Sequence, residues 1–150
     1  MAGMKGKADS AAKPICTDIN ARSGMSSQPG TPALAARWTD GRLYPYTGEY
    51  DPAKANTHDT GIGQTSAVGN FPNGTAFEGL HDLSGNVFEW CLNGYSKPEN
   101  IQIGGNKSRV LRGGSWGYNQ SSACAVSRFH GIPYERNDDN GFRLACSSPI

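Results

Sequence analysis

The stretch "GLHDLSGNVFEW" (79–90) marks the point at which regular structure begins in this chain. A long run of turn-forming residues precedes it, from Gly41 to Phe77, and is rich in Gly, Pro, Asn, Asp and Thr. The stretch itself closes on Val87, Phe88 and Trp90, which are residue types enriched in strands. This pattern predicts a strand of which both faces are partly buried.

Further strand signals follow toward the C-terminus. The segments "SRVLRG" (108–113), "ACAVSRF" (123–129) and "GFRLAC" (141–146) are short, and a Gly-Gly pair stops the first of them. In the last segment, Phe142 and Leu144 would lie on one face, because side chains alternate along a strand. The sequence therefore predicts a small antiparallel sheet that carries long loops.

The N-terminal part of the chain has a different composition. Residues 1–30 show no apolar periodicity, so we interpret them as a flexible leader that precedes a domain over residues 31–150. The segment "TPALAARW" (31–38) then offers Thr31 as an N-cap and Pro32 at the first helical position, which predicts a short helix.

Composition and charge exclude several classes of protein. The chain has 150 residues and a net charge of +1, so it forms one domain and has no electrostatic footprint for nucleic acid. No apolar run is long enough for membrane insertion. Without a signal peptide we expect a cytoplasmic protein, or one that is exported or virion-associated by a route that the sequence does not display. The four cysteines lack CxxC spacing, which favours free thiols over disulfides or zinc.

The motifs also point to a known family. "GLHDLSGNVFEW", "RVLRGGSW" (109–116) and "NGFRLAC" (140–146) occur in an order that resembles the formylglycine-generating-enzyme-like (sulfatase-modifying factor) domain, and the resemblance covers roughly residues 33–146. It implies an α+β, C-type lectin-like fold with a small antiparallel sheet and long irregular loops. It also implies that the N-terminal half of the family domain is missing from this chain.

The resemblance bears on catalysis. Formylglycine-generating enzymes hold a copper ion with two cysteine thiolates after the "GGS-aromatic" turn, because soft thiolates suit Cu(I). Here Tyr118 stands at the position of the first of these cysteines, and only Cys124 falls in the segment. We therefore expect no copper and favour a non-catalytic module. The alternative is a truncated formylglycine-generating oxidase.

The resemblance further implies a calcium site. Its ligand positions correspond here to Asp82, Gly85, Val87 and Glu89. A hard cation takes oxygen ligands, and a tight turn can bring two carboxylates and two carbonyls to one point. The alternative is that Asp82 and Glu89 pair with Arg112, Arg128 or Arg143 beneath the loops.

The stretch 117–140 differs from the segments that flank it. We expect the flanking aromatics Trp90, Trp116 and Phe142 to belong to the core. The stretch itself is rich in Tyr, Ser, Gly and Asn, which adaptable binding loops use on rigid scaffolds. We interpret it as a surface for a protein or other surface ligand. The predicted contact residues are Tyr118, Asn119, Ser121, Ser122, Phe129, His130, Ile132, Tyr134, Glu135, Asn137, Asp138 and Asp139.

This stretch also resembles the variable region of the variable proteins of diversity-generating retroelements, which "RGGSW" and "GFRLA" flank. In that group, adenines of Asn codons are randomised, and such codons cannot yield Lys, Glu, Gln, Met or Trp. Lys, Met and Trp are absent between Gly117 and Asn140, whereas Gln120 and Glu135 break the rule. An ordinary lectin-fold loop remains the alternative interpretation.

Overall fold

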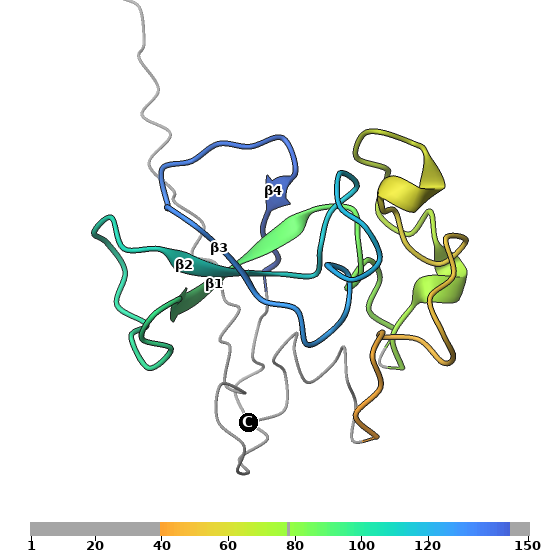
Figure 1. The fold of residues 1–150 in the computed structure, drawn as a ribbon, viewed down its shortest axis with the longest axis horizontal. Helices are drawn as coiled ribbons and strands as arrows, with labels where there is room; N and C mark the ends of the chain where they lie inside the picture. Colours follow the sequence, from red (N-terminus) through yellow and green to blue (C-terminus); the bar gives the residue numbers. More distant parts are fainter. Residues whose placement is uncertain (1–39, 78, 145–150) are drawn as a thin grey trace, which may run out of the picture.

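The structure is a computed structural model that describes residues 40–77 and 79–144. The predicted leader (1–30), the predicted helix (31–38) and Cys146 lie outside these residues. Figure 1 shows the strands gathered on one side of the molecule, with irregular loops and two short 3-10 helices on the other.

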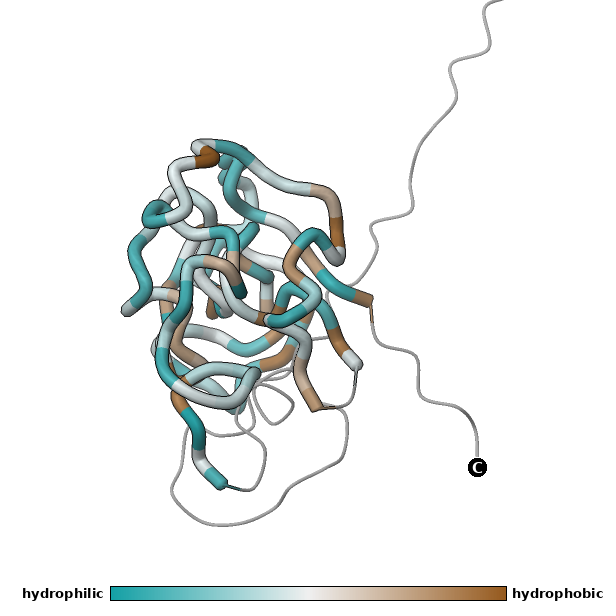
Figure 2. Tube along the Cα trace, turned by 90° about the vertical axis from the view of Figure 1, so that its right-hand side faces the viewer, coloured by the Kyte–Doolittle hydropathy of each residue, from teal (hydrophilic) through white to brown (hydrophobic). Residues whose placement is uncertain are grey.

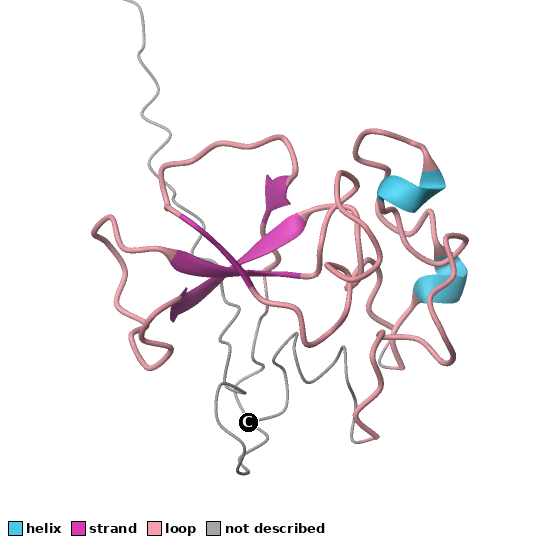
Figure 3. Ribbon diagram, viewed as in Figure 1, coloured by secondary structure: helices cyan, strands magenta, loops and turns pink. Residues whose placement is uncertain are grey.

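The regular elements are short. Two 3-10 helices come first, η1 (His58–Thr60) and η2 (Pro72–Gly74). The strands β1 (Phe88–Gly94), β2 (Arg109–Arg112), β3 (Phe129–Gly131) and β4 (Asn140–Gly141) follow. Figure 3 shows how much of the described chain is loop, as the high content of Gly, Pro and Asn predicted.

The strands form one sheet in the order β3-β2-β1-β4. β1 pairs with β2 and β2 pairs with β3 in antiparallel fashion, but β4 runs parallel to β1. The sheet is therefore mixed: the predicted antiparallel pairing is present from β1 to β3, whereas β4 at the edge departs from it. A parallel neighbour requires a long connection. Residues 132–139 supply the last part of it, and they belong to the predicted binding stretch.

The third predicted strand was misplaced. The segment 123–127 forms turns, with Ala123 N–H donating to Gln120 O at 3.1 Å and Ser127 N–H donating to Cys124 O at 2.9 Å. Tertiary contacts hold it there, because the Ser84 hydroxyl donates to Ala123 O at 2.7 Å. The strand starts only at Phe129, where pairing with β2 becomes available.

The core is small. On one face of the sheet, Cys91 and Val110 are almost fully buried and Tyr95 packs against them. On the loop side, Ala76, Leu83 and Ala125 form a second cluster. Figure 2 shows that hydrophobic residues are scattered along a tube that is mostly hydrophilic or neutral. Buried polar bonds must therefore hold much of the loop region in place.

Asn56 is the centre of those polar bonds. Its side-chain amide is 1% exposed and donates to Gln64 O at 2.9 Å, while its backbone carbonyl accepts from Asn86 N–H at 2.7 Å. The Asn86 side chain in turn accepts from Ser66 N–H at 2.9 Å. This network ties the loop that precedes η1 to the turn that precedes β1.

Candidate binding surface

Both ends of the stretch 117–140 are fixed by the frame, by which we mean the sheet β1–β4 and the buried residues beneath the loops. At its start, Gly114 has a φ of 75° and an added Cβ would lie 2.8 Å from the Ala123 Cα atom. At its end, Asp139 accepts a bond from the Ser115 hydroxyl at 3.0 Å through its carboxylate and one from Phe88 N–H at 2.8 Å through its carbonyl. The stretch thus forms two loops on a rigid base: a first loop before β3 (117–128) and a second loop after β3 (132–139).

The first loop contains an aromatic cluster. The Tyr118 ring meets Phe88 edge-on with centroids 5.1 Å apart, and Phe129 lies 4.9 Å from Phe88. Phe88 is buried, Phe129 is half-buried and Tyr118 is 44% exposed. Phe129, one of the predicted contact residues, therefore belongs mainly to the frame. Tyr118 presents one face to solvent.

Polar residues complete this loop. Asn119 and Ser121 are exposed, and the Ser121 hydroxyl donates to the Asn119 side-chain oxygen at 2.6 Å. Ser122 is only 6% exposed, so its side chain does not reach a partner from this position.

The second loop begins at the edge of the sheet. His130 is exposed and its ring lies 4.5 Å from that of Tyr95. The Glu135 carboxylate accepts from Ile132 N–H at 2.9 Å and closes the turn that follows β3. Tyr134, at the tip of that turn, is 64% exposed.

The predicted contact residues therefore divide into two sets. Ser122, Phe129 and Asp139 serve the frame, and Ile132 is half-buried. The outward-facing set comprises Tyr118, Asn119, Ser121, His130, Tyr134, Glu135, Asn137 and Asp138.

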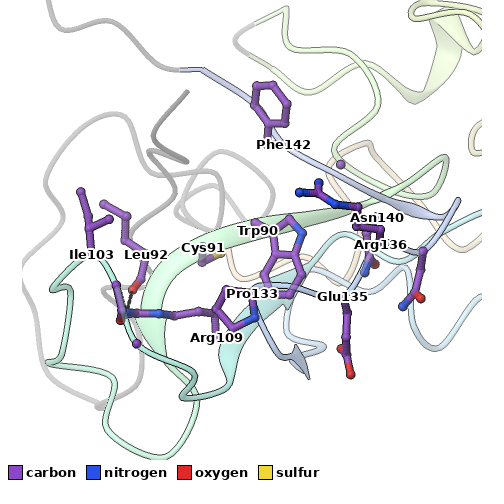
Figure 4. Close-up of a pocket in the computed structure, with 14 residues that line it drawn as sticks. Trp90, Cys91, Leu92, Ile103, Arg109, Pro133, Glu135, Arg136, Asn140 and Phe142 are labelled. Atoms are coloured by element: carbon purple, nitrogen blue, oxygen red, sulfur yellow. Dashed lines mark hydrogen bonds between the residues drawn. The ribbon is translucent and has the colours of Figure 1, made fainter. Parts of the chain in front are cut away.

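A groove of about 580 Å³ lies beside the second loop. Figure 4 shows Trp90 at its centre, Phe142 above, Ile103 and Leu92 on one side, and Glu135 and Arg136 on the other. Trp90 is half-buried and Phe142 is 57% exposed. The expectation that Phe142 belongs to the core was wrong, because among the described residues nothing covers its outer face.

The β1–β2 loop supplies the opposite wall of this groove, which the sequence did not predict. Ile103 is 67% exposed on it. Arg109 holds the loop in place, because its guanidinium donates to the carbonyls of Leu92 at 2.5 Å and of Asn100 at 3.2 Å, and also to that of Gln102. An isoleucine flanked by Gln and Gly in a hairpin loop was the available signal for an exposed apolar contact.

The two carboxylates among the predicted calcium ligands have protein partners. The Glu89 carboxylate receives three bonds from the Arg143 guanidinium: Nε donates to Oε1 at 2.9 Å and to Oε2 at 3.2 Å, and Nη2 donates to Oε1 at 2.6 Å. The Asp82 carboxylate accepts from Gly69 N–H at 2.9 Å. Gly85 N–H donates to Gly113 O at 2.7 Å, and Val87 is half-buried. This is the arrangement that the ion-pair alternative describes for Glu89.

Metal-binding side chains do not cluster in the described ranges. Within residues 40–77 and 79–144, no three or more His, Cys, Asp or Glu side chains are grouped so as to hold a metal ion. The Cys124 thiol donates to the Tyr44 hydroxyl at 3.4 Å, and Cys91 is 1% exposed. In the same ranges, no helix is long and apolar enough to cross a membrane.

Three comparisons place this geometry among known proteins. The family model for the sulfatase-modifying factor enzyme 1-like domain matches residues 21–148. The chain is 32% identical over 123 residues to the inactive C-alpha-formylglycine-generating enzyme 2 of Mus musculus, covering 72% of this chain and 38% of that protein. It is 33% identical over 116 residues to the serine/threonine-protein kinase Pkn1 of Chlamydia trachomatis, covering 70% and 18%.

A solved structure has the same fold. Treponema denticola variable protein 1 superposes with a TM-score of 0.63 at 24% identity, covering 74% of this chain and 43% of that chain. At this identity the likeness concerns the fold alone. The chain spans less than half the length of each of these proteins.

Proposed function

Since the chain belongs to the family of sulfatase-modifying factor enzyme 1-like domains, we propose that it is a non-catalytic binding module on that scaffold. Its contact surface is the outward-facing set of the stretch 117–140. Its partner is a protein or another surface ligand.

One observation carries this proposal: exposed contact residues stand on an internally bonded frame. Tyr134 projects from the turn that Glu135 closes, His130 projects from β3, and Tyr118 rests on the buried Phe88 ring. Tyrosine offers a large contact area at low entropy cost, and a loop that is already ordered loses little freedom on binding.

We also propose that a diversity-generating retroelement varies this surface. Glu135, which an Asn codon mutated at its adenines cannot yield, is the residue whose carboxylate closes the turn after β3. A fixed codon is expected at a position with such a structural role. Tyr118, His130 and Asp138 can all arise from Asn codons, and all three face outward. The Treponema variable protein supports the same proposal at the level of the fold.

A display experiment tests the binding role. One library randomises Tyr118, Asn119, His130 and Tyr134. The matched library randomises four exposed residues outside the stretch 117–140, which are Glu49, Ile62, Thr65 and Val68. We expect the first library to yield folded binders to a fixed panel of proteins far more often than the second. Equal yields would contradict a dedicated surface. Stoichiometric binding of Cu(I) by two thiols would instead favour the oxidase alternative.

A further inference from the structure

The groove beside the second loop carries an inference that rests on the proposed function and deepens it. Trp90 lines it from β1, Phe142 from the segment just after β4, and Ile103 from the β1–β2 loop. Phe142 and Ile103 are 57% and 67% exposed, so large apolar faces meet water here. Contiguous exposed apolar surface on a folded domain commonly marks an interaction site, and its burial is favourable.

The walls of the groove are fixed by internal bonds. Arg109 holds the carbonyls of Leu92 and Asn100, and the Glu135 carboxylate holds Ile132 N–H. The floor belongs to β1, which is paired on both sides. A ligand that enters would therefore meet a largely formed site, which reduces the entropy cost of binding. The volume of about 580 Å³ lies in the range of small-ligand sites.

The charged side chains that line the groove differ in whether they can pair with a ligand. The residues that line it include Arg109, Glu135 and Arg136, so their net charge is positive. Arg109 is buried and bonded to carbonyls, and Glu135 uses one carboxylate oxygen in the turn. Arg136 is exposed and forms no hydrogen bond or ion pair within the described residues. Asp138, two residues further along the chain, is also exposed and carries a negative charge. An anion would therefore be attracted to the Arg136 guanidinium itself and not to the whole rim of the groove.

We propose that this groove takes a large apolar side chain from a partner polypeptide, and that Arg136 pairs with a carboxylate next to that side chain. The apolar walls favour an aromatic or branched side chain over a sugar, because they offer a hydroxyl-rich ligand few groups to bond. The free guanidinium favours an acidic neighbour over a basic one.

Titration of the ¹⁵N-labelled full chain by NMR tests this proposal. The probes are N-acetyl-tryptophan, which has a carboxylate, N-acetyl-tryptophanamide, which lacks it, and methyl glucoside. The indole N–H signal of Trp90 reports occupancy, and the spectrum of Trp90→Phe identifies that signal. The variant is Arg136→Gln, and Lys107→Gln is the control because Lys107 is exposed but does not line the groove.

We expect saturable shifts of the Trp90 signal, with the acid binding about two- to fivefold more tightly than the amide, as for an exposed ion pair. Arg136→Gln should abolish that difference and Lys107→Gln should keep it. Equal binding of acid and amide by the unmodified chain, no saturation with either, or saturation by the glucoside alone would overturn the proposal. Such a failure leaves the display result intact, so the groove and the wider surface are tested separately.

Discussion

Gly131 is the residue at which the sheet and the groove depend on each other most closely. An added Cβ would lie 2.7 Å from the Trp90 Cη2 atom and 3.2 Å from the Leu111 Cδ1 atom. The indole of Trp90 therefore lies over β3 only because position 131 has no side chain.

We predict that Gly131→Ala lowers the free energy of unfolding by about 1–3 kcal/mol, the usual cost of overpacking. Urea unfolding measures the change. Gly117→Ala is the matched control, because no atom lies closer than 4.0 Å to its added Cβ and its φ is not positive. A loss at Gly117 as large as that at Gly131 would show that the cost is not contact with Trp90.

The Glu89–Arg143 pair is the second residue-scale feature. Its side chains are 10% and 26% exposed, and Arg143 also donates to the carbonyls of His81 at 2.9 Å and Asp82 at 3.2 Å. Removing one partner leaves a charge that is largely withdrawn from water. We predict that Glu89→Gln costs about 3 kcal/mol in the free energy of unfolding.

Thermal unfolding with and without excess EDTA separates this pair from the calcium site that the sequence predicted. The ion pair predicts the same melting temperature in both conditions. A melting temperature that falls in EDTA and recovers when calcium is restored would instead assign Asp82 and Glu89 to the metal.

The tyrosines near the first loop give a pH-dependent signal. Burial raises the pKa of Tyr46 to about 12, and burial likewise raises the pKa of Tyr44 and Tyr50. A raised pKa in the folded state favours the neutral phenol. The stabilisation is therefore complete below the unfolded pKa near 10 and is lost as the pH rises toward about 12.

We predict that ultraviolet titration of the native chain shows tyrosines that ionise later than those of the urea-unfolded chain. Tyr46→Phe should reduce the size of the late step. A native titration curve that coincides with the unfolded curve would contradict the burial of these three rings.

At the scale of elements, the sequence predicted the central strands but not the edges of the sheet. β1 was found because Val87, Phe88 and Trp90 are strand-forming residues, and β2 was found because a Gly-Gly pair ends a short strand-forming segment. The segment 123–129 has the same composition, yet its first five residues form turns because Ser84 and Leu43 bind its backbone. Such contacts between distant parts of a chain are not visible in a local pattern. The superposition on the Treponema protein confirms the C-type lectin-like fold.

The contact residues were predicted from the composition of the stretch 117–140. Composition, like a local strand pattern, does not show which residues are buried by contacts with distant parts of the chain. Tyr134 and Asn137 are exposed as predicted, whereas Phe129 is drawn into the sheet by pairing with Leu111 and by contact with Phe88. The exposure of Phe142 was not predicted, because Phe142 was assigned to the core from the motif in which it stands. The residues that surround it in space were not known from the sequence.

The two loop aromatics should therefore behave differently. We predict that Phe129→Ala costs about 2–4 kcal/mol, since a half-buried ring loses most of its packing. Tyr134→Ala should change the free energy of unfolding by less than about 0.5 kcal/mol. Chemical unfolding of both variants measures the contrast. Similar losses at the two positions would place Tyr134 in the frame and remove it from the contact surface.

At the scale of the whole molecule, the structure combines a bonded frame with a surface that the frame does not need. The chain covers 38% of the mouse relative and 43% of the Treponema chain, so the described domain is a part of what those proteins contain. The predicted absence of the N-terminal half of the family domain stays a prediction, as does the role of residues 1–30. What the described part does provide is a set of exposed side chains, among them Tyr134, Asn137 and Asp138, that take no part in the hydrogen bonds of the frame.

Deep sequencing of this gene across its source population, together with the DNA on either side, tests the central claim most directly. We predict that substitutions concentrate at the codons of outward-facing residues such as Tyr118, Asn119 and Tyr134. They should fall at adenines of a nearby repeat beside a reverse transcriptase gene. The codons for Gly114, Ser115, Glu135 and Asp139 should stay constant. Substitutions spread evenly over frame and loops, with no such repeat, would contradict a diversified binding surface.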